Sequence, residues 1–429
     1  MAAAPGIYAM SDRITATYLI ESGHSLQHAA DVLAGEQSSG TFVDLPLETE
    51  ALQSRHGARV ESIQPLGLVD EPSLPGATST KDRWRQATVE VSYPVENIGP
   101  DLPNLRTMLA GNLFELQELS GIRLLDVAVP PSFAKAFPGP AYGIEGTRDA
   151  VDVTDGPIIG TIIKPSVGLS PTETAEVVRS VVNAGVDFIK DDELIADPPY
   201  SRIADRIETV MDVIHRHEDR TGKRVMYACN ITGSVEAMRD RHDLVHDAGG
   251  NCVMVSLNSV GLSGLLAIRR HAELPIHGHR NGWGALSRHP LLGASFPAFQ
   301  LLWRLAGADH LHVNGLENKF AEENASVIRS ATAVQTPIAD PDDRAMPVFS
   351  SGQWAGQAPA TYEALGNADL MYLCGGGIHG HPDGPAAGVA HLRQGWEAAV
   401  AGIPLADHAE NNPELARAID HYGPIPTEW

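Results

Sequence analysis

The stretch around which this chain is organised reads Phe188-Ile189-Lys190-Asp191-Asp192-Glu193. Its first residues continue an apolar run that is typical of a buried strand. Lys190 and Asp192 are two residues apart, so they share one face of an extended chain, and Glu193 joins them once the chain turns. Two carboxylates at a strand end suit Mg²⁺, which prefers oxygen ligands, whereas a protonated lysine beside that ion is unfavourable. The stretch therefore indicates either a metal site whose lysine has been made anionic or a solvated acidic turn.

Apolar runs typical of strands alternate with helical patterns on both sides of this stretch. Eight runs follow one another, at residues 160–166, 188–193, 224–232, 251–258, 274–281, 309–314, 346–352 and 369–377. Helical patterns follow most of them, at 206–217, 235–247, 296–305 and 386–400. Another begins at Ser170-Pro171-Thr172-Glu173, a capping box with proline at the first helical position. Eight strand–helix units predict an α/β fold whose C-terminal part is a (β/α)8 TIM barrel.

The region before the barrel has a different pattern. Strands are expected at 14–21, 87–93 and 122–129, and helices at 25–33 and 105–119. This mixture predicts a small ferredoxin-like α+β domain. Residues 130–156 are rich in proline and glycine, which is typical of a linker. We therefore expect an N-terminal domain over residues 1–145 and a catalytic barrel over residues 146–429.

Composition narrows the range of partners. The chain has 429 residues, of which 43% are hydrophobic and 20% charged, as expected of a folded protein. Its formal charge of −23 argues against nucleic acid and an anionic membrane as partners, since both require a basic surface. The three cysteines have no metal-binding spacing, and the N-terminus lacks the basic and apolar segments of a signal peptide. No apolar run is long enough to cross a bilayer. The scattered cysteines fit a reducing compartment, so a cytoplasmic location is expected.

Polar residues follow six of the eight predicted strands. Active sites of TIM barrels lie at the C-terminal strand ends, so these residues are expected on one catalytic rim. Lys164 ends the first strand and could serve as a general base, a Schiff-base nucleophile or a positive charge over an enolate. Lys319, on the loop after the sixth strand, could close over a ligand. The alternative interpretation of Lys319 is a solvated loop lysine.

Two groups on this rim suit anions. Gly375-Gly376-Gly377 leaves the backbone N–H groups at the end of the eighth strand accessible to a phosphate. Arg280 offers a planar fork for a second anion, with His312 and Ser350 as hydrogen-bond partners. A plain turn and a rim salt bridge are the corresponding structural interpretations. Together with the metal ligands, these groups indicate a sugar phosphate or keto-acid phosphate as the ligand.

In their order and spacing, these segments resemble the large chain of RuBisCO. The resemblance rests on residues 160–165 (Gly-Thr-Ile-Ile-Lys-Pro), 190–193 (Lys-Asp-Asp-Glu), 277–280 (His-Gly-His-Arg), 309–312 (Asp-His-Leu-His) and 375–377 (Gly-Gly-Gly), and it covers nearly the whole chain. It implies that Lys190 reacts with CO₂, as an activator, to form a carbamate. That carbamate would bind one Mg²⁺ together with Asp192 and Glu193.

The resemblance also implies roles for the other rim residues. Lys164 becomes an acid/base or enolate-stabilising residue, His279 a polar partner near the metal, and Lys319 the lysine of the closing loop. The two phosphate sites consist of Arg280, His312 and Ser350 on one side, and of Gly352, Gly375 and Gly376 with Thr41 and Phe42 on the other. Glu36 and Asn112 would enter the neighbouring subunit's site. A homodimer without a small subunit is therefore the expected active assembly.

Several positions depart from the CO₂-fixing members of that family. Ser166 stands where those members have a second lysine, Trp283 where they have a histidine, and Phe42 where they have a tryptophan. The segment before Lys319 also lacks their small-residue pattern. The chain is therefore identified as a RuBisCO-like protein of the form IV kind, with the enolisation machinery retained.

The resemblance leaves several reactions open. Form IV relatives tautomerise or isomerise phosphates of methionine salvage, or decarboxylate or hydrolyse an oxo-isoapionate phosphate. Retention of both anion sites suits a substrate with a phosphate and a carboxylate, which favours the oxo-isoapionate type. Asn112 counts against the tautomerase, which is thought to use a lysine near that position. The rival hypotheses are a genuine carboxylase, a Schiff-base aldolase that uses Lys164, and a non-catalytic regulatory protein.

Overall fold

The computed structural model of the protein describes residues 12–39 and 45–425, which divide into two compact units. The N-terminal unit contains the described residues up to Pro138, together with 282–305 and 338–341. The barrel unit contains 139–281, 306–337 and the described residues from Asp342 onward. None of the helices in the described ranges combines the length and the apolar character that a membrane span requires.

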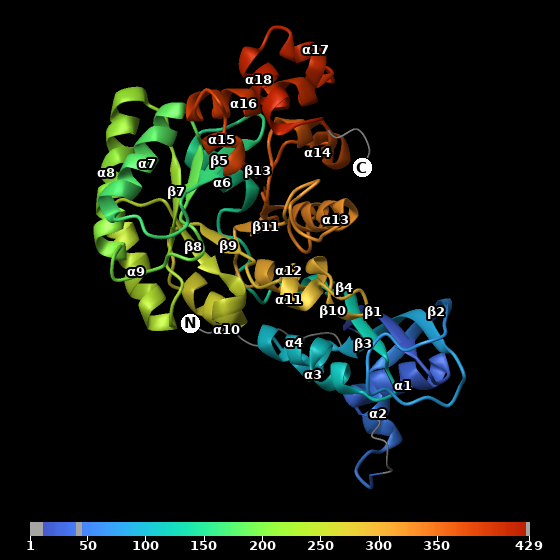
Figure 1. The fold of residues 1–429 in the computed structure, drawn as a ribbon. Helices are drawn as coiled ribbons and strands as arrows, with labels where there is room; N and C mark the ends of the chain where they lie inside the picture. The colour runs from blue at the N-terminus through green and yellow to red at the C-terminus, as the bar shows by residue number, and fades with distance from the viewer. Residues whose placement is uncertain (1–11, 40–44, 426–429) are drawn as a thin grey trace. The chain divides into compact units, whose positions relative to one another are not determined.

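A five-stranded sheet forms the core of the N-terminal unit (Figure 1). Its strands, in order across the sheet, are β10 (Leu292–Ala294), β4 (Gly121–Ala128), β1 (Arg13–Ser22), β3 (Trp84–Pro94) and β2 (Arg59–Val69). The central strand β1 pairs antiparallel with both β3 and β4. The three strands expected from the sequence, β1, β3 and β4, are confirmed. The parallel edge strand β10 was not expected, because it comes from residues far along the chain.

The helices of this unit match the sequence expectation only in part. They are α1 (Leu26–Glu36), α2 (Glu50–His56), α3 (Val95–Ile98), α4 (Leu102–Ala110), the 3-10 helix η1 (Asn112–Glu115), α5 (Pro131–Ala134), α11 (Gly284–Ser287) and α12 (Phe296–Leu305). The single helix expected at 105–119 is wrong, because Gly111 leaves the helical region with φ −72° and ψ −115°. The helix expected at 296–305 is present as α12, but it packs against β4 in this unit.

A closed parallel barrel of eight strands forms the core of the barrel unit. The strands are β5 (Ile158–Ile162), β6 (Phe188–Lys190), β7 (Met226–Asn230), β8 (Cys252–Ser256), β9 (Ile276–His279), β11 (His310–His312), β12 (Met346–Phe349) and β13 (Met371–Leu373). Seven of them lie within the runs expected from the sequence, and β5 begins two residues before its expected run at 160–166, so the TIM barrel is confirmed. The C-terminal ends of the strands therefore define one rim, where TIM-barrel active sites lie.

Helices surround this barrel, with α7, α8 and α9 on one flank in Figure 1. They are α7 (Pro171–Ala184), α8 (Ile203–Thr221), α9 (Val235–Asp247), α10 (Leu257–Arg269), α13 (Asn324–Gln335), α14 (Ala358–Leu365), α15 (Gly376–His379), α16 (Pro385–Ala401), α17 (Leu405–Ala409) and α18 (Pro413–Tyr422), with the 3-10 turns η2 (Pro341–Asp343) and η3 (Ala355–Gln357). The capping box expected at the start of α7 is present, because Ser170 and Glu173 bond each other's backbone N–H groups.

The helix α6 (Gly143–Val151) packs against the N-terminal end of the barrel. Its residues Ile144 and Val151 belong to one buried cluster with side chains from the starts of the strands, such as Ile158 and Met346. Thr147 lies on the same buried face of α6. The boundary between the two units, at Pro138 and Gly139, lies within the crossing predicted over 130–156. The segment is not an unstructured linker throughout, because apolar residues at helical spacing form α6 despite the surrounding proline and glycine.

Candidate active site

The turn after β6 brings the predicted metal ligands together on the rim. The Lys190 amine donates to the backbone oxygen of Asp191 over 2.9 Å and lies 3.3 Å from a carboxylate oxygen of Glu193. The Lys190 side chain is 2% exposed. Burial lowers the pKa of Lys190 despite the attraction of the neighbouring carboxylates. Lowering the pKa increases the share of the neutral amine, which is the form that reacts as a nucleophile.

Lys164 and His279 complete the surroundings of this turn. The Lys164 amine donates to Asp192 over 2.8 Å and to the Ser166 hydroxyl over 2.6 Å. The imidazole Nε2 of His279 lies 3.5 Å from the Glu193 carboxylate. Burial lowers the pKa of His279 to about 4. Burial by itself would raise the pKa of Glu193, but the neighbouring His279 and Lys190 lower it to about 2. Glu193 is therefore ionised and available to a cation at neutral pH.

Asp191, the middle acid of the turn, points away from this group. It is 1% exposed and forms an ion pair with Arg206 over 3.2 Å. The Tyr227 hydroxyl also donates to Asp191, and the backbone N–H of Asn230 donates to it over 2.9 Å. These partners come from α8 and β7, so Asp191 fixes the turn to its neighbours while Asp192 and Glu193 face the rim.

Arg280, expected at one anion site, is held by a carboxylate that the sequence did not identify. The Arg280 guanidinium donates to Glu322, which also accepts from the Asn314 amide over 2.6 Å. Ser326 donates to the second oxygen of Glu322 over 2.9 Å. Glu322 follows Lys319 on the same loop, and no residue type or spacing in the sequence pairs it with Arg280. An incoming anion therefore competes with Glu322 for this guanidinium.

His312 and Ser350 lie at the same corner, and both are buried. His312 Nδ1 is 3.1 Å from the Ser350 hydroxyl, and the rings of His312 and His279 are 4.4 Å apart. Burial lowers the pKa of His312 well below its ordinary value, with further lowering by the neighbouring His279 ring. The predicted partners of one anion site are thus next to the predicted metal ligands.

The glycines of the second expected anion site lie on the same rim. Gly376 begins α15, and a Cβ placed there would meet no neighbouring atom within 4 Å. The backbone N–H of Lys319 donates to the Ser351 oxygen over 3.1 Å, which places the Lys319 loop beside Gly352. Gly352 has a φ of +97°, which favours glycine, and it is exposed. These exposed backbone segments leave room for a ligand.

The expected contributions from the N-terminal unit are described only in part. Glu36 ends α1 and Asn112 begins η1, and both side chains are exposed. The side chain of Gln37 lies against Gly111, so Glu36 and Asn112 share one edge of this unit. Thr41 and Phe42 lie outside the described residues.

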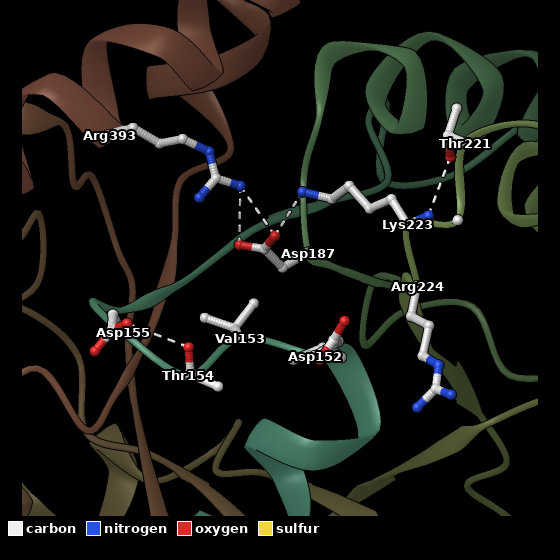
Figure 2. Close-up of a pocket in the computed structure, with 11 residues that line it drawn as sticks. Asp152, Val153, Thr154, Asp155, Asp187, Thr221, Lys223, Arg224 and Arg393 are labelled. Carbon is white, nitrogen blue, oxygen red and sulfur yellow. Dashed lines mark hydrogen bonds and ion pairs between the residues drawn. The ribbon is translucent and has the colours of Figure 1, made fainter.

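A polar cavity of about 440 Å³ lies at the opposite end of the barrel. Figure 2 shows its centre, where Asp187 lies between Lys223 and Arg393. Asp187 is buried and accepts from Lys223 over 2.7 Å and from Arg393 over 2.9 Å. Asp187 precedes β6, Lys223 precedes β7, and Arg393 lies on α16. They lie at the N-terminal ends of the barrel strands, where residues of TIM barrels contribute to stability and not to catalysis. The cavity is therefore separate from the catalytic rim.

A further group with metal-ligand side chains consists of His242 and Asp243 on α9 and His271 in the turn after α10. The backbone N–H of Glu273 donates to His242 Nε2 over 3.2 Å, so the ring proton of neutral His242 is on Nδ1. That nitrogen lies 3.0 Å from Asp243, which also accepts from His271 over 2.7 Å. The group thus satisfies its own hydrogen bonds without a cation.

Comparisons with known protein families match most of the chain. Residues 143–422 match the catalytic domain of the ribulose bisphosphate carboxylase large chain, and residues 7–133 match its N-terminal domain. The chain belongs to the RuBisCO large-chain family. It is a RuBisCO-like protein within that family, as the sequence predicted, because its most similar relatives carry names of that group or of related lyases.

Three relatives of this RuBisCO-like protein are informative. A "3-oxo-isoapionate-4-phosphate transcarboxylase/hydrolase" of Xanthobacter autotrophicus is 56% identical, over 96% of this chain and 99% of the relative. A "3-oxo-isoapionate-4-phosphate decarboxylase" of Rhizobium rhizogenes is 47% identical, over 95% of this chain and 97% of the relative. The crystal structure of a rubisco-like protein from Burkholderia fungorum superposes with a TM-score of 0.91 at 47% identity, over 96% of this chain and 100% of that one.

Two departures from the CO₂-fixing enzymes now have structural counterparts. The Ser166 hydroxyl accepts a hydrogen bond from the Lys164 amine. The position where the CO₂-fixing members have a second lysine therefore holds a neutral hydrogen-bond acceptor. Trp283 is 5% exposed and packs against Phe296 and Phe299, with ring centroids 5.1 and 5.3 Å apart. The position where the CO₂-fixing members have a histidine thus holds a core residue in this RuBisCO-like protein.

Proposed function

We propose that this RuBisCO-like protein is a Mg²⁺-dependent enzyme that acts on a sugar-acid phosphate of the 3-oxo-isoapionate-4-phosphate type, by decarboxylation or hydrolysis. The observation that carries the proposal is the buried Lys190 amine, which lies 3.3 Å from Glu193 beside Asp192. The names of the two most informative relatives point to the same substrate class.

The donor set fits a Mg²⁺ ion. Asp192 and Glu193 supply carboxylate oxygens, which are the ligands that Mg²⁺ prefers. Lys190 as an ammonium group would repel the ion, and the lowering of its pKa by burial increases the share of the neutral amine. Addition of CO₂ to that amine gives an anionic carbamate and releases a proton, and the carbamate supplies a third oxygen ligand. Bound there, Mg²⁺ would polarise the keto oxygen of the substrate and offset the negative charge that develops on it.

In this proposal, Lys164 transfers a proton to the substrate. Its side chain is 44% exposed, so the amine reaches the open rim while it remains bonded to Asp192. When the C–C bond to the carboxylate breaks, CO₂ leaves and the electron pair stays on the substrate carbon. A protonated Lys164 delivers a proton to that carbon or stabilises the charge beside it. In hydrolysis, the same amine positions the attacking water.

The remaining rim residues orient the two anionic groups of the substrate. Arg280 provides a bidentate fork for one of them once Glu322 gives way. The backbone N–H groups around Gly352, Gly375 and Gly376 bind the other, and Lys319 covers the ligand from its loop. A substrate with a single charge would leave one of these groups unused, which is why a phosphate that also carries a carboxylate fits best.

The active assembly under this proposal is a homodimer in the cytoplasm. Glu36 and Asn112 are exposed on one edge of the N-terminal unit, where they are available to the site of a second copy. Thr41 and Phe42 would join the glycines of that site. Mixing an Asn112→Ala variant with a Lys190→Ala variant, each inactive by itself, is expected to restore part of the activity if the sites are shared between subunits.

The proposal is tested with 3-oxo-isoapionate-4-phosphate, Mg²⁺ and bicarbonate, by following CO₂ release and product formation. Lys190→Ala is expected to abolish both turnover and Mg²⁺ binding measured by calorimetry, because it removes the amine that becomes the third ligand. Lys81→Ala, at an exposed lysine, is the matched control and should retain full activity. Undiminished wild-type activity in metal-free buffer would refute the mechanism, and incorporation of labelled CO₂ into ribulose bisphosphate would favour a carboxylase.

A further inference from the structure

A continuous chain of hydrogen bonds runs through the barrel interior behind the part of the rim formed by Arg280, His312 and Ser350. We call this part of the rim the Arg280 corner. It begins at Thr147 Oγ1, which lies 2.9 Å from His310 Nε2. His310 Nδ1 lies 3.3 Å from His277 Nδ1, and His277 Nε2 lies 2.8 Å from His312 Nε2. His312 Nδ1 then lies 3.1 Å from the Ser350 hydroxyl. We refer to these five residues as the histidine chain.

The histidine chain is assembled from four separate segments and is shielded from water. Its members come from α6, β11, β9 and the residue after β12. Every member is at most 6% exposed. Burial of an imidazole ring in an apolar interior is unfavourable unless each ring nitrogen has a hydrogen-bond partner. Here each of the six ring nitrogens has one, so the chain is completely satisfied.

The direction of these hydrogen bonds is set at Thr147. Its hydroxyl lies within hydrogen-bond distance of the Gly143 carbonyl oxygen, which can only accept, so the Thr147 proton goes there. Thr147 therefore accepts from His310, whose single proton must be on Nε2. His310 Nδ1 is then an acceptor, and His277 donates to it from Nδ1. His277 Nε2 becomes an acceptor in turn and receives the proton of His312 Nε2.

Each ring carries only one proton in this arrangement because burial keeps the rings neutral. It lowers the pKa of His310 to about 4 and the pKa values of His277 and His312 well below their ordinary value. A second proton on His310 or His277 would also place two donors opposite each other within the chain. The hydrogen-bond geometry and the burial thus lead to the same protonation pattern.

We propose that Thr147, His310 and His277 are positioning residues that hold the His312 proton on Nε2 and direct the Nδ1 lone pair of His312 toward Ser350. The Ser350 hydroxyl then donates inward to His312. The neighbouring Ser351 does not reverse this, because it lies 3.4 Å from Ser350 and donates to Asn314 over 3.0 Å. Ser350 consequently offers an oxygen lone pair to the rim.

This arrangement determines what the Arg280 corner accepts, and in that respect the inference rests on the proposed function of the rim. An anion there takes its hydrogen bonds from Arg280, whereas the Ser350 oxygen selects a group that carries a proton, such as a substrate hydroxyl. Reversal of the histidine chain would place a proton on His312 Nδ1 and free the Ser350 hydroxyl to donate outward. The corner would then favour a fully ionised phosphate.

The wild-type protein, without substrate, provides the first test. Histidine-selective ¹⁵N labelling and two-bond ¹H–¹⁵N correlation spectra at neutral pH report which ring nitrogen carries the proton, with assignments from single His→Gln variants. We expect protons on Nε2 of His310 and His312 and on Nδ1 of His277. A His312 proton on Nδ1 would overturn the proposal.

The second test compares Thr147→Val with Thr147→Ser. Serine keeps the hydroxyl and should leave the spectrum unchanged, whereas valine removes the anchor at similar volume and should shift the tautomers of all three histidines together. Inorganic phosphate, titrated by calorimetry, should bind about ten- to a hundredfold more tightly to Thr147→Val, as expected for about one added hydrogen bond to a charged group. Unchanged tautomers and phosphate affinity in a folded Thr147→Val protein would refute the inference. Neither readout uses the keto-acid substrate, so failure of the proposed reaction and failure of this inference are distinguishable.

Discussion

Replacement of Arg206 by methionine tests whether the rim turn depends on the ion pair beneath it. Arg206 is fully buried, and its guanidinium bonds Asp191 over 3.2 Å and the Ala196 carbonyl over 2.6 Å. Burial by itself would lower the pKa of Arg206, but the adjacent Asp191 raises it, so the pair is ionised. Methionine fills a similar volume and leaves the Asp191 carboxylate buried without its cation.

The expected loss of stability is large because a buried charge remains behind. Removing one member of a buried ion pair costs about 3–5 kcal/mol, which corresponds to a decrease in Tm of roughly 3–6 °C for a chain of this size. Arg202→Met provides the matched control one turn earlier. Arg202 pairs with Asp197 over 2.7 Å, but its side chain is 57% exposed, so that loss should be at most about 1 kcal/mol.

Differential scanning calorimetry of the metal-free protein measures both effects. The double variant Asp191→Asn/Arg206→Met removes both charges and should recover part of the stability that Arg206→Met loses. Because Asp191 lies between Lys190 and Asp192, Arg206→Met should also weaken Mg²⁺ binding at a temperature where the protein remains folded. Equal Tm values for Arg206→Met and Arg202→Met would show that the buried pair does not hold this turn.

Two further predictions concern the anion corner and acid stability. Glu322→Gln should strengthen the binding of inorganic phosphate severalfold in calorimetry, since the carboxylate no longer competes for Arg280. Glu323→Gln, at the exposed neighbouring position, is the control. Weaker phosphate binding to Glu322→Gln would show that Glu322 does not compete with the anion. Burial lowers the pKa values of His279, His310 and His391 to about 4 in the folded protein, below the ordinary value of 6.5. These depressed values stabilise the fold above pH 6.5, and the contribution is lost as the pH falls toward 4, at about 1.4 kcal/mol per pKa unit and group. Urea unfolding of the metal-free protein at pH 7.5 and 5 should show this loss, and equal stabilities would exclude it.

The barrel could be predicted because its signal is local and repeated. Each buried parallel strand is an apolar run, and helical spacing or a capping box such as Ser170 to Glu173 marks the element that follows it. The N-terminal unit was predicted less completely, since β10 joins its sheet from residues 292–294, after five strands of the barrel have passed. No pattern within a short segment predicts that β10 pairs with β4, because the two strands are far apart in the sequence.

The rim residues show the same division. Lys164, Lys190, Asp192, Glu193 and His279 were identified from their positions at strand ends, and the structure brings them together. Glu322 and Thr147 were missed, because each acts through a partner that is remote in the sequence or in the fold. Thr147 lies on α6, which was not predicted because the proline and glycine content of residues 130–156 indicated a linker.

The sequence by itself determined the parallel barrel, the order of the polar strand ends and hence the kind of chemistry, because periodicity and strand-end position are properties of short segments. Only the tertiary structure decided which carboxylate faces the rim and which is buried, which acid holds Arg280, and which nitrogen of His312 carries its proton. Those outcomes depend on burial and on single hydrogen bonds between segments 8 to 163 residues apart, such as Thr147 to His310. Closure of the barrel, which places all strand ends on one ring, is what brings these segments into contact.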